Sequence, residues 1–473
     1  MRARGIKLSE TMGTDSVNKL LVRFSTPSVI SMVISSSYSL VDSIFIGRLG
    51  PVALAAIAVA SPLMMIFNAI GQGTGIGAAS LVGRRLGEKN YAAANRAACV
   101  GITSFFMVGG LTSIICLLSL DWLLRLFGAD DSVLPLARSY MIVETGFIVL
   151  DFLHLTLAEL IRAEGHPVIA SSAIITSGIA NCIFDPILMF GLGPVPALGM
   201  AGAAFATSVG RALGIMMLLT HLLSGKTAYQ FHPKYFVPDF KIFIDIYRVG
   251  IASIARRTCG SISHIVANRV AAPFGVVPLA VLGVIFRTSS LANQPSMGLG
   301  QGMLPLVAYN YGARQVKRIG EVVLKSVVAS FVWASFCWVI ALLLATNVMS
   351  IFSSDPDFVA EGGRAFRIFS LVFFSVGVQQ ILGYFFQGIG RGFPALILGL
   401  SRQLIFMVPL LLILTSLFGL NGMWAAFPAA DMLGLMLALV WTRVTFRELG
   451  IPFSLRHSKE VLGAAATADP GDK

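Results

Sequence analysis

Charged side chains are scarce in this chain. They make up 12% of its 473 residues, whereas 56% of the residues are hydrophobic. So little charge cannot cover the surface of a water-soluble globule of this size. The composition therefore excludes a soluble protein and predicts a polytopic membrane protein.

Cysteine is also rare. The five cysteines all lie within apolar stretches and form no Cys-x-x-Cys pair, which argues against a disulfide framework and against a zinc site. The formal net charge is +12, but no basic run is interleaved with aromatic residues, so we expect no nucleic-acid partner. We expect no cofactor, and the N-terminus lacks the small-residue cleavage site of a signal peptide.

Apolar stretches long enough to cross a bilayer recur along the whole chain. A helix rises ~1.5 Å per residue, so about 20 apolar residues span a hydrocarbon core of ~30 Å. The stretches lie near 24–46, 52–83, 97–120, 139–161, 168–192, 200–223, 249–272, 276–307, 326–352, 365–389, 394–418 and 422–442. The sequence predicts an all-α integral membrane protein with about twelve transmembrane helices.

Basic residues predict the orientation of these helices. Lys and Arg gather before the first stretch and after the second, fourth, sixth, eighth, tenth and last, whereas the alternate loops are poor in them. Cytoplasmic loops of membrane proteins carry such an excess. Both termini are therefore predicted to be cytoplasmic, and we expect a multi-pass protein of the inner (plasma) membrane.

An internal repeat divides the chain into two halves. The segment GTGIGAASLVGRRLG at 73–87 aligns with GLGQGMLPLVAYNYG at 298–312, and residue 298 minus residue 73 gives a shift of 225. Two parallel halves predict two pseudo-symmetric six-helix lobes that rock about a central site, which gives alternating access. The repeated glycines suit close helix contact. The predicted organisation is a cytoplasmic N-terminal segment (1–23), a first lobe (24–223), a cytoplasmic linker (224–248), a second lobe (249–442) and a cytoplasmic, partly disordered tail (443–473).

The first apolar stretch carries a carboxylate, Asp42. An acid inside the membrane costs roughly 2.5–3.5 kcal/mol on insertion scales, so it should face a protein interior or a wet cavity and serve a function there. Tyr38 lies one turn earlier on the same helix face. The alternative is an interfacial position, because Arg48 follows only six residues later.

Three polar residues of the fifth and sixth stretches complete a candidate coupling site with Asp42. Asn181 and Asp185 share a helix face, and Thr207 lies near mid-membrane depth. Their oxygens could bind a small hard cation such as Na⁺, or the two acids could share an exchangeable proton. A structural role beside Pro186 is the alternative for Asn181 and Asp185. The shift of 225 finds no acid opposite Asp42 or Asp185, so we expect the acids in the first lobe only.

The fourth stretch carries Glu144, Asp151 and His154 on one face. These residues could line the substrate path, attract a cation or pass protons. Arg211 lies one turn after Thr207 and could neutralise an acid of the first lobe, which makes it a possible modulator of the site.

The chain resembles the multidrug and toxic compound extrusion (MATE) family. The resemblance runs from about Leu20 to Arg447, and its most specific motifs are YSLVDSIFIGRLGPVALAAIAVASP (38–62), IRAEGHP (161–167), NCIFDPILMFGLG (181–193) and GLGQGMLPLVAYNYGA (298–313). It implies twelve helices in two lobes and export of cationic or amphipathic compounds in exchange for Na⁺ or H⁺. It also implies a first-lobe cation site at Asp42, Asn181, Asp185 and Thr207, and a bend of the first helix at Pro27.

These observations predict a cation-coupled secondary antiporter and not an enzyme. Its expected partners are a small-molecule substrate and membrane lipid, and we expect a monomer. A flippase for a lipid-linked oligosaccharide, from the same superfamily, is the alternative. An intramembrane enzyme has only Asp151 with His154 as a possible catalytic pair, without Ser or Cys at motif spacing. A passive channel would transport without regard to an ion gradient.

Overall fold

The computed structural model describes residues 2–230 and 232–451. These residues form helices joined by short turns, and no β-strand occurs among them beyond an isolated bridge between Leu192 and Val195. The predicted all-α fold class is therefore confirmed. Of the predicted tail, residues 452–473 lie outside the described part of the chain.

The helices divide at the segment that follows α9. Those of the first half are α1 (Arg2–Thr14), α2 (Val17–Gly47), α3 (Pro51–Gly87), α4 (Tyr91–Leu118), α5 (Leu120–Leu126), α6 (Leu134–Gly146), α7 (Ile148–Ala163), α8 (Pro167–Phe190) and α9 (Gly199–Leu223). A short 3₁₀ helix, η1 (Pro233–Tyr235), leads into the second half.

The second half begins inside the predicted linker, because α10 starts at Phe240. Its helices are α10 (Phe240–Ala271), the 3₁₀ helix η2 (Ala272–Phe274), α11 (Val276–Gly312), α12 (Val316–Leu343), α13 (Ala345–Ser350), α14 (Pro356–Ser370), α15 (Phe373–Gly388), α16 (Gly392–Leu400), the π-helix η3 (Ser401–Phe406) and α17 (Met407–Glu448).

Local sequence explains where several helices begin and end. Asn90 caps α4 by accepting from the backbone N–H of Ala93 at 3.1 Å, and Asp239 caps α10 by accepting from the N–H of Lys241 at 3.0 Å. Pro167 stands in the first turn of α8, where its missing N–H costs nothing. Gly191, with φ +77°, follows the last residue of α8.

Eight helices of the described residues are long and apolar enough to cross a membrane, and ten spans result when each bent helix pair counts as one. The bent pairs are α6 with α7, at 50°, and α14 with α15, at 45°. The predicted stretches 139–161 and 365–389 are therefore broken helices. The backbone also leaves the helical conformation inside α17 at Gly419, with φ +57°. This division, together with the less apolar α10, agrees with about twelve crossing segments.

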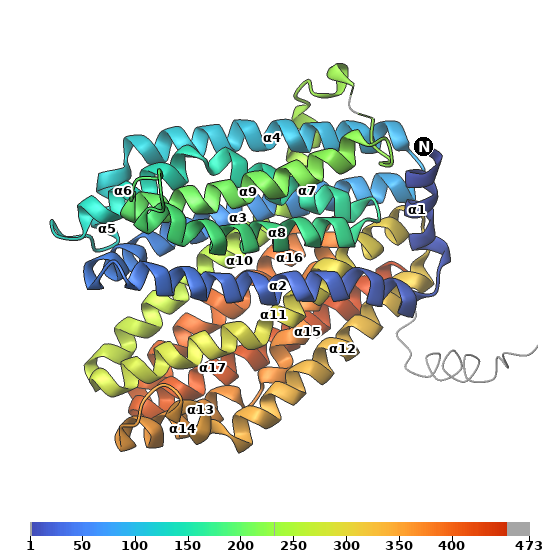
Figure 1. Cartoon of the computed structure of the whole chain (residues 1–473). Coiled ribbons are helices and arrows are strands. Elements are labelled where there is room, and N and C mark those ends of the chain that lie inside the picture. The colour runs from blue at the N-terminus through green and yellow to red at the C-terminus, as the bar shows by residue number, and fades with distance from the viewer. Residues whose placement is uncertain (1, 231, 452–473) are drawn as a thin grey trace, which may run out of the picture.

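The helices form two lobes (Figure 1). The first, α2 to α9, fills the upper part of Figure 1 in blue to green, and most of the second, α10 to α17, lies below it in yellow to red. The short helix α1 covers one end of the molecule, at the right of the view. The two-lobed architecture expected from the repeat is thus confirmed.

Glycines bring the two lobes together at the end near α1. A Cβ added to Gly87 of α3 would collide with the carbonyl oxygen of Tyr309 in α11, and one added to Gly312 would collide with the carbonyl oxygen of Arg84. Residues 87 and 312 are 225 apart, as are residues 84 and 309. The two contacts are therefore one contact repeated by the pseudo-two-fold relation.

The same relation holds for the neighbouring helix pairs. A Cβ on Gly73 of α3 would lie 2.5 Å from Ile254 of α10, and one on Gly298 of α11 would lie 2.6 Å from the Cα of Val29 in α2. Residue 298 lies 225 positions after residue 73, and residue 254 lies 225 positions after residue 29. Small residues at these positions allow the helix backbones of opposite lobes to touch.

The apolar core is continuous at one end and divided at the other. One buried cluster joins the whole first lobe to the part of the second lobe nearest α1, including Met303 and Tyr384. The opposite end of the second lobe has a separate cluster around Trp424 and Phe427. The lobes are therefore joined through a shared core at one end, and in Figure 1 they diverge away from that end.

We expect Gly302→Ala to destabilise the protein, because a Cβ there would lie 2.7 Å from the Cα of Ser25 in the other lobe. Overpacking of this kind costs about 1–3 kcal/mol. The measurement is the thermal unfolding midpoint of the detergent-purified protein. Gly283→Ala, in the same helix with no atom within 4 Å of the added carbon, is the control and should leave the midpoint unchanged or raise it. Equal midpoints for both variants would contradict the tight inter-lobe contact.

Candidate functional site

Asp42 lies in α2 with its side chain directed at α8. Its carboxyl group is within hydrogen-bonding reach of the carboxyl group of Asp185. One turn earlier, the ring of Tyr38 packs against Gly178 of α8, where an added Cβ would lie 2.7 Å from the ring. The polar face of α2 that the sequence indicated therefore faces the interior of the first lobe.

Asn181 links the other members of the predicted coupling site. Its side-chain nitrogen donates to Oδ1 of Asp185 at 3.1 Å and to Oγ1 of Thr207 in α9 at 3.2 Å. The hydroxyl of Thr207 in turn donates to the carbonyl oxygen of Ala203. Gly210 allows this close approach, since an added Cβ would lie 2.5 Å from the backbone of α8. The structure thus brings Asp42, Asn181, Asp185 and Thr207 together, and we call them the first-lobe acid cluster.

Three oxygens of this cluster are buried with no hydrogen-bond partner among the described residues: Oδ1 of Asp42, Oδ1 of Asn181 and Oδ2 of Asp185. Buried polar atoms in folded proteins are normally paired, because an unpaired one retains its full desolvation cost. Carboxyl and amide oxygens can be satisfied by a proton on one acid or by a hard cation. The cluster is therefore arranged to take up a positive charge.

Arg211 holds a second pair of acids. Its Nη1 donates to Oε2 of Glu144 at 2.9 Å, and its Nε lies 3.0 Å from Oδ1 of Asp151 in a second ion pair. All three side chains are largely buried, with 13% of the Arg211 side chain exposed. Because Glu144 ends α6 and Asp151 begins α7, the guanidinium from α9 bridges the bend at Phe147. One guanidinium thus contacts two acids.

His154 lies in a closely packed position between helices. Nε2 of His154 lies 3.3 Å from Oγ of Ser177, and an added Cβ on Gly214 would lie 2.7 Å from the same nitrogen. His154 is therefore enclosed between α7, α8 and α9.

Pro27 lies within α2, which is a single continuous helix from Val17 to Gly47. A functional bend at Pro27 stays a prediction.

The second lobe also contains a buried acid, so the expectation that acids occur only in the first lobe is wrong. Asp431 of α17 is 4% exposed and accepts a hydrogen bond from Nε of Arg402 in η3. Its backbone carbonyl accepts from Nε2 of Gln379 at 2.9 Å. The shift of 225 tests for acids only at the positions that correspond to Asp42 and Asp185. Asp431 lies at neither position, although it is visible within the apolar stretch 422–442.

Sequence reasoning also missed a group at the ends of α7, α8 and α9. Atoms of Glu164, His166 and His221 that could bind a metal lie within 4.8 Å of one another. Glu164 already accepts from Nε2 of His221 at 3.2 Å, from the hydroxyl of Thr227 and from the N–H of Ala228 at 3.0 Å. Glu164 and His166 both lie in the motif at 161–167, but His221 is more than fifty residues away, so no local pattern could join all three.

A family model, MatE, matches the chain twice, at residues 27–187 and again at residues 253–413. Residue 253 minus residue 27 gives a separation of 226, which agrees with the internal repeat. The two matches fall in the two lobes and together cover most of the chain.

Relatives and solved structures agree with this match. The chain is 26% identical over 447 residues to the multidrug export protein MepA of Staphylococcus haemolyticus, a similarity that covers 93% of this chain and 94% of the relative. It is also similar to a crystal structure of MATE in the straight conformation, with a TM-score of 0.87, 26% identity and coverage of 94% of this chain and 99% of that one. An outward-facing multidrug resistance MATE family transporter gives a TM-score of 0.86, with 26% identity and coverage of 94% and 98%. The family resemblance of the motifs is thereby confirmed, and this chain belongs to the MATE family.

Proposed function

We propose that this chain is a secondary antiporter that exports cationic or amphipathic small molecules by alternating access in exchange for a cation. Its membership of the MATE family and its near full-length similarity to a multidrug export protein support export. The observation that carries the coupling is the first-lobe acid cluster, in which three buried oxygens have no hydrogen-bond partner within the part of the chain that the structure describes. The coupling ion supplies the positive charge that these oxygens would bind.

The contact between Asp42 and Asp185 favours a proton as the coupling ion. Two close carboxylates repel each other when both are ionised, and a hydrogen bond between them requires a proton on one. Asn181 presents its nitrogen, and not its oxygen, to both Asp185 and Thr207. Na⁺ is the second candidate, because the donor set is made of oxygens.

Charge explains how the ion and the substrate would exclude one another. With the pair deprotonated, the cluster attracts an organic cation, and with one proton bound, that attraction weakens. Such opposed binding is a coupling free energy between two ligands. Exchange of one proton for one monovalent organic cation moves no net charge. A pH gradient then supplies about 1.4 kcal/mol per unit, whereas the membrane potential contributes only if the charge of the substrate differs from +1.

We propose no covalent chemistry for this chain. Asp151 is bound to Arg211, and His154 faces Ser177 instead of Asp151. The hydroxyl of Ser177 donates to the carbonyl oxygen of Ala173 within its own helix. The pair on which an enzymatic function would depend is therefore not assembled as a catalytic dyad.

We also propose that the protein lies in the inner membrane with the end that carries α1 in the cytoplasm. The basic residues counted in the sequence support this orientation, because Arg84 and Arg85 end α3, and Arg162 ends α7. The monomeric state and the absence of a cofactor stay predictions.

The first test is Asp42→Asn, which we expect to abolish efflux because an amide cannot release a proton or offer a negative charge. The measurement is accumulation of a fluorescent cationic dye by cells that express equal amounts of membrane-inserted protein. Asp121→Asn is the control, since Asp121 is 55% exposed in a surface pair with Arg138, and it should retain efflux. Normal dye efflux by the Asp42 variant would refute the assignment.

The second test identifies the coupling ion. Purified protein in proteoliposomes is given a pH gradient or a Na⁺ gradient separately, and export of the dye is followed. We expect transport to follow the pH gradient and to be lost in Asp185→Asn. Transport that follows Na⁺ alone would replace the proton by Na⁺, whereas transport indifferent to both gradients would contradict antiport.

The third test concerns Arg211. Removing one partner of a buried ion pair typically costs about 3–5 kcal/mol, because the remaining charge stays buried. We expect Arg211→Gln to lower the thermal unfolding midpoint strongly and Asp151→Asn to restore part of it in the same chain. Arg125→Gln, which breaks an exposed pair with Asp131, should have little effect. A stable Arg211 variant that Asp151→Asn does not change further would show that the network does not stabilise the lobe.

A further inference from the structure

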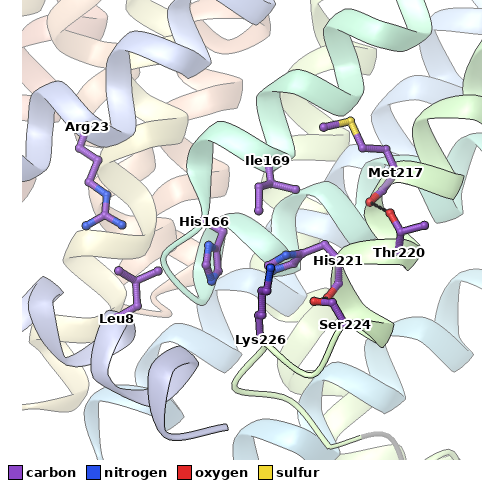
Figure 2. A pocket seen from close by; sticks show the side chains of 9 residues that line it. All are labelled: Leu8, Arg23, His166, Ile169, Met217, Thr220, His221, Ser224 and Lys226. Atoms are coloured by element: carbon purple, nitrogen blue, oxygen red, sulfur yellow. Dashed lines mark hydrogen bonds between the residues drawn. The ribbon is translucent and has the colours of Figure 1, made fainter. Parts of the chain in front are cut away.

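A pocket of about 600 Å³ opens at the α1 end of the first lobe (Figure 2). Its polar lining comes from Arg23 of α2, His166 before α8, Thr220 and His221 of α9, and Ser224 and Lys226 after α9. Figure 2 shows these side chains around a common space, with Leu8 of α1 closing one side. This volume is within the range of small-ligand sites, and it is separate from the first-lobe acid cluster.

The pocket has two permanent positive charges and no carboxylate in its described lining. Arg23 makes one long hydrogen bond, 3.5 Å, to the carbonyl oxygen of Gly165, and neither Arg23 nor Lys226 forms an ion pair within the described residues. The nearest acid, Glu164, is fully buried behind the histidines and already accepts three hydrogen bonds. An anion in the pocket would therefore meet uncompensated positive charge.

The histidines add hydrogen-bonding groups to the pocket. Nε2 of His166 is buried with no partner among the described residues, and its ring meets the ring of His221 edge-on, with centroids 4.5 Å apart. Burial, followed by His221 and Arg23, lowers the pKa of His166 to about 4, so the ring is neutral near pH 7. The hydroxyls of Thr220 and Ser224 lie beside the two histidines in the lining. The pocket can thus offer several hydrogen bonds to one ligand.

The surface next to the pocket is apolar and exposed. Val22 is 65% exposed, Met216 59% and Leu223 81%, although each belongs to a helix long and apolar enough to cross the membrane. Such side chains on membrane helices face lipid chains. The basic pocket therefore lies at the end of this exposed apolar surface.

We propose that this pocket binds the phosphate group of an anionic phospholipid, with Arg23 and Lys226 as its charge partners. Basic pockets between membrane helices, on the side where positive residues gather, recognise such headgroups. The acyl chains would lie along the exposed apolar surface of α2 and α9, and the histidines and hydroxyls would contact the polar headgroup. The bound lipid would tie together α1, α2, α8 and α9.

A metal ion fits the same residues less well. Three ligand atoms of Glu164, His166 and His221 are close enough to be considered, but Glu164 already uses both carboxylate oxygens. The two fixed positive charges at the pocket also oppose a second cation. Phosphate, by contrast, is attracted by both.

The test measures the thermal unfolding midpoint of the full chain in detergent with dioctanoyl phosphatidylglycerol, dioctanoyl phosphatidylcholine, inorganic phosphate or ZnCl₂. We expect phosphatidylglycerol to raise the midpoint by about 2–4 °C near saturation, and phosphatidylcholine and phosphate to have little effect. Arg23→Gln with Lys226→Gln should weaken the apparent affinity for phosphatidylglycerol at least tenfold.

Two further variants test whether the effect depends on charge at the pocket itself. Arg443→Gln with Lys241→Gln removes the same charges from exposed positions and should leave the rise intact. Thr220→Glu, at an exposed lining residue, adds an acid without removing a base and should abolish the rise even if the double variant does not fold.

Three results would overturn the proposal. An equal rise with phosphatidylcholine would remove the role of charge, and an equal rise with inorganic phosphate would assign the pocket to a soluble anion. A rise with ZnCl₂ that His166→Ala removes, without a rise with phosphatidylglycerol, would assign it to a metal.

Discussion

Negative charge buried within the first lobe is the constraint on which this structure depends. A carboxylate in a membrane must be paired, protonated or exposed to water, because its desolvation is otherwise too costly. Arg211 supplies this pairing for Glu144 and Asp151. Asp42 and Asp185 have each other, and Asp185 also accepts from the amide of Asn181, but neither acid forms an ion pair within the described residues. The first lobe thus contains two kinds of buried acid: Glu144 and Asp151, which form ion pairs between helices, and Asp42 and Asp185, which do not.

Near α1 the lobes approach one another closely at glycines, where their backbones come into contact. Contacts such as Gly87 with Tyr309 recur at a shift of 225 in the opposite lobe, so the same few residues build both halves of the inter-lobe surface. Glycine contacts allow close approach while leaving few side chains to disentangle. Together with a core that is shared at one end only, this geometry suits the rocking motion on which the proposed antiport depends.

The two lobes have corresponding helices but differ in the charged residues that these helices bury. The helices that hold Asn181 and Thr207 in the first lobe correspond to those that hold Arg402 and Asp431 in the second. In the second lobe the acid is paired by an arginine on a π-helical turn, a feature that often marks functional positions. The charge of Asp431 is therefore paired within its own lobe.

Hydropathy and the repeat determined the fold class and the two-lobed plan, and short motifs carried the family resemblance, because these signals are local or recur at a fixed interval. They also identified Asp42 and Asp185 as unusual, since an acid in an apolar stretch is visible in one dimension. The sequence placed both acids in one candidate coupling site, but it could not show which of their atoms meet, because α2 and α8 are separated by more than a hundred residues.

Only the tertiary structure decided which charges meet. It gave Arg211 to Glu144 and Asp151 rather than to Asp42, it paired Asp431 with Arg402, and it gathered the basic pocket from segments between Leu8 and Lys226. Ion pairing depends on distances of a few ångströms between helices, and those distances arise from packing that no local pattern encodes.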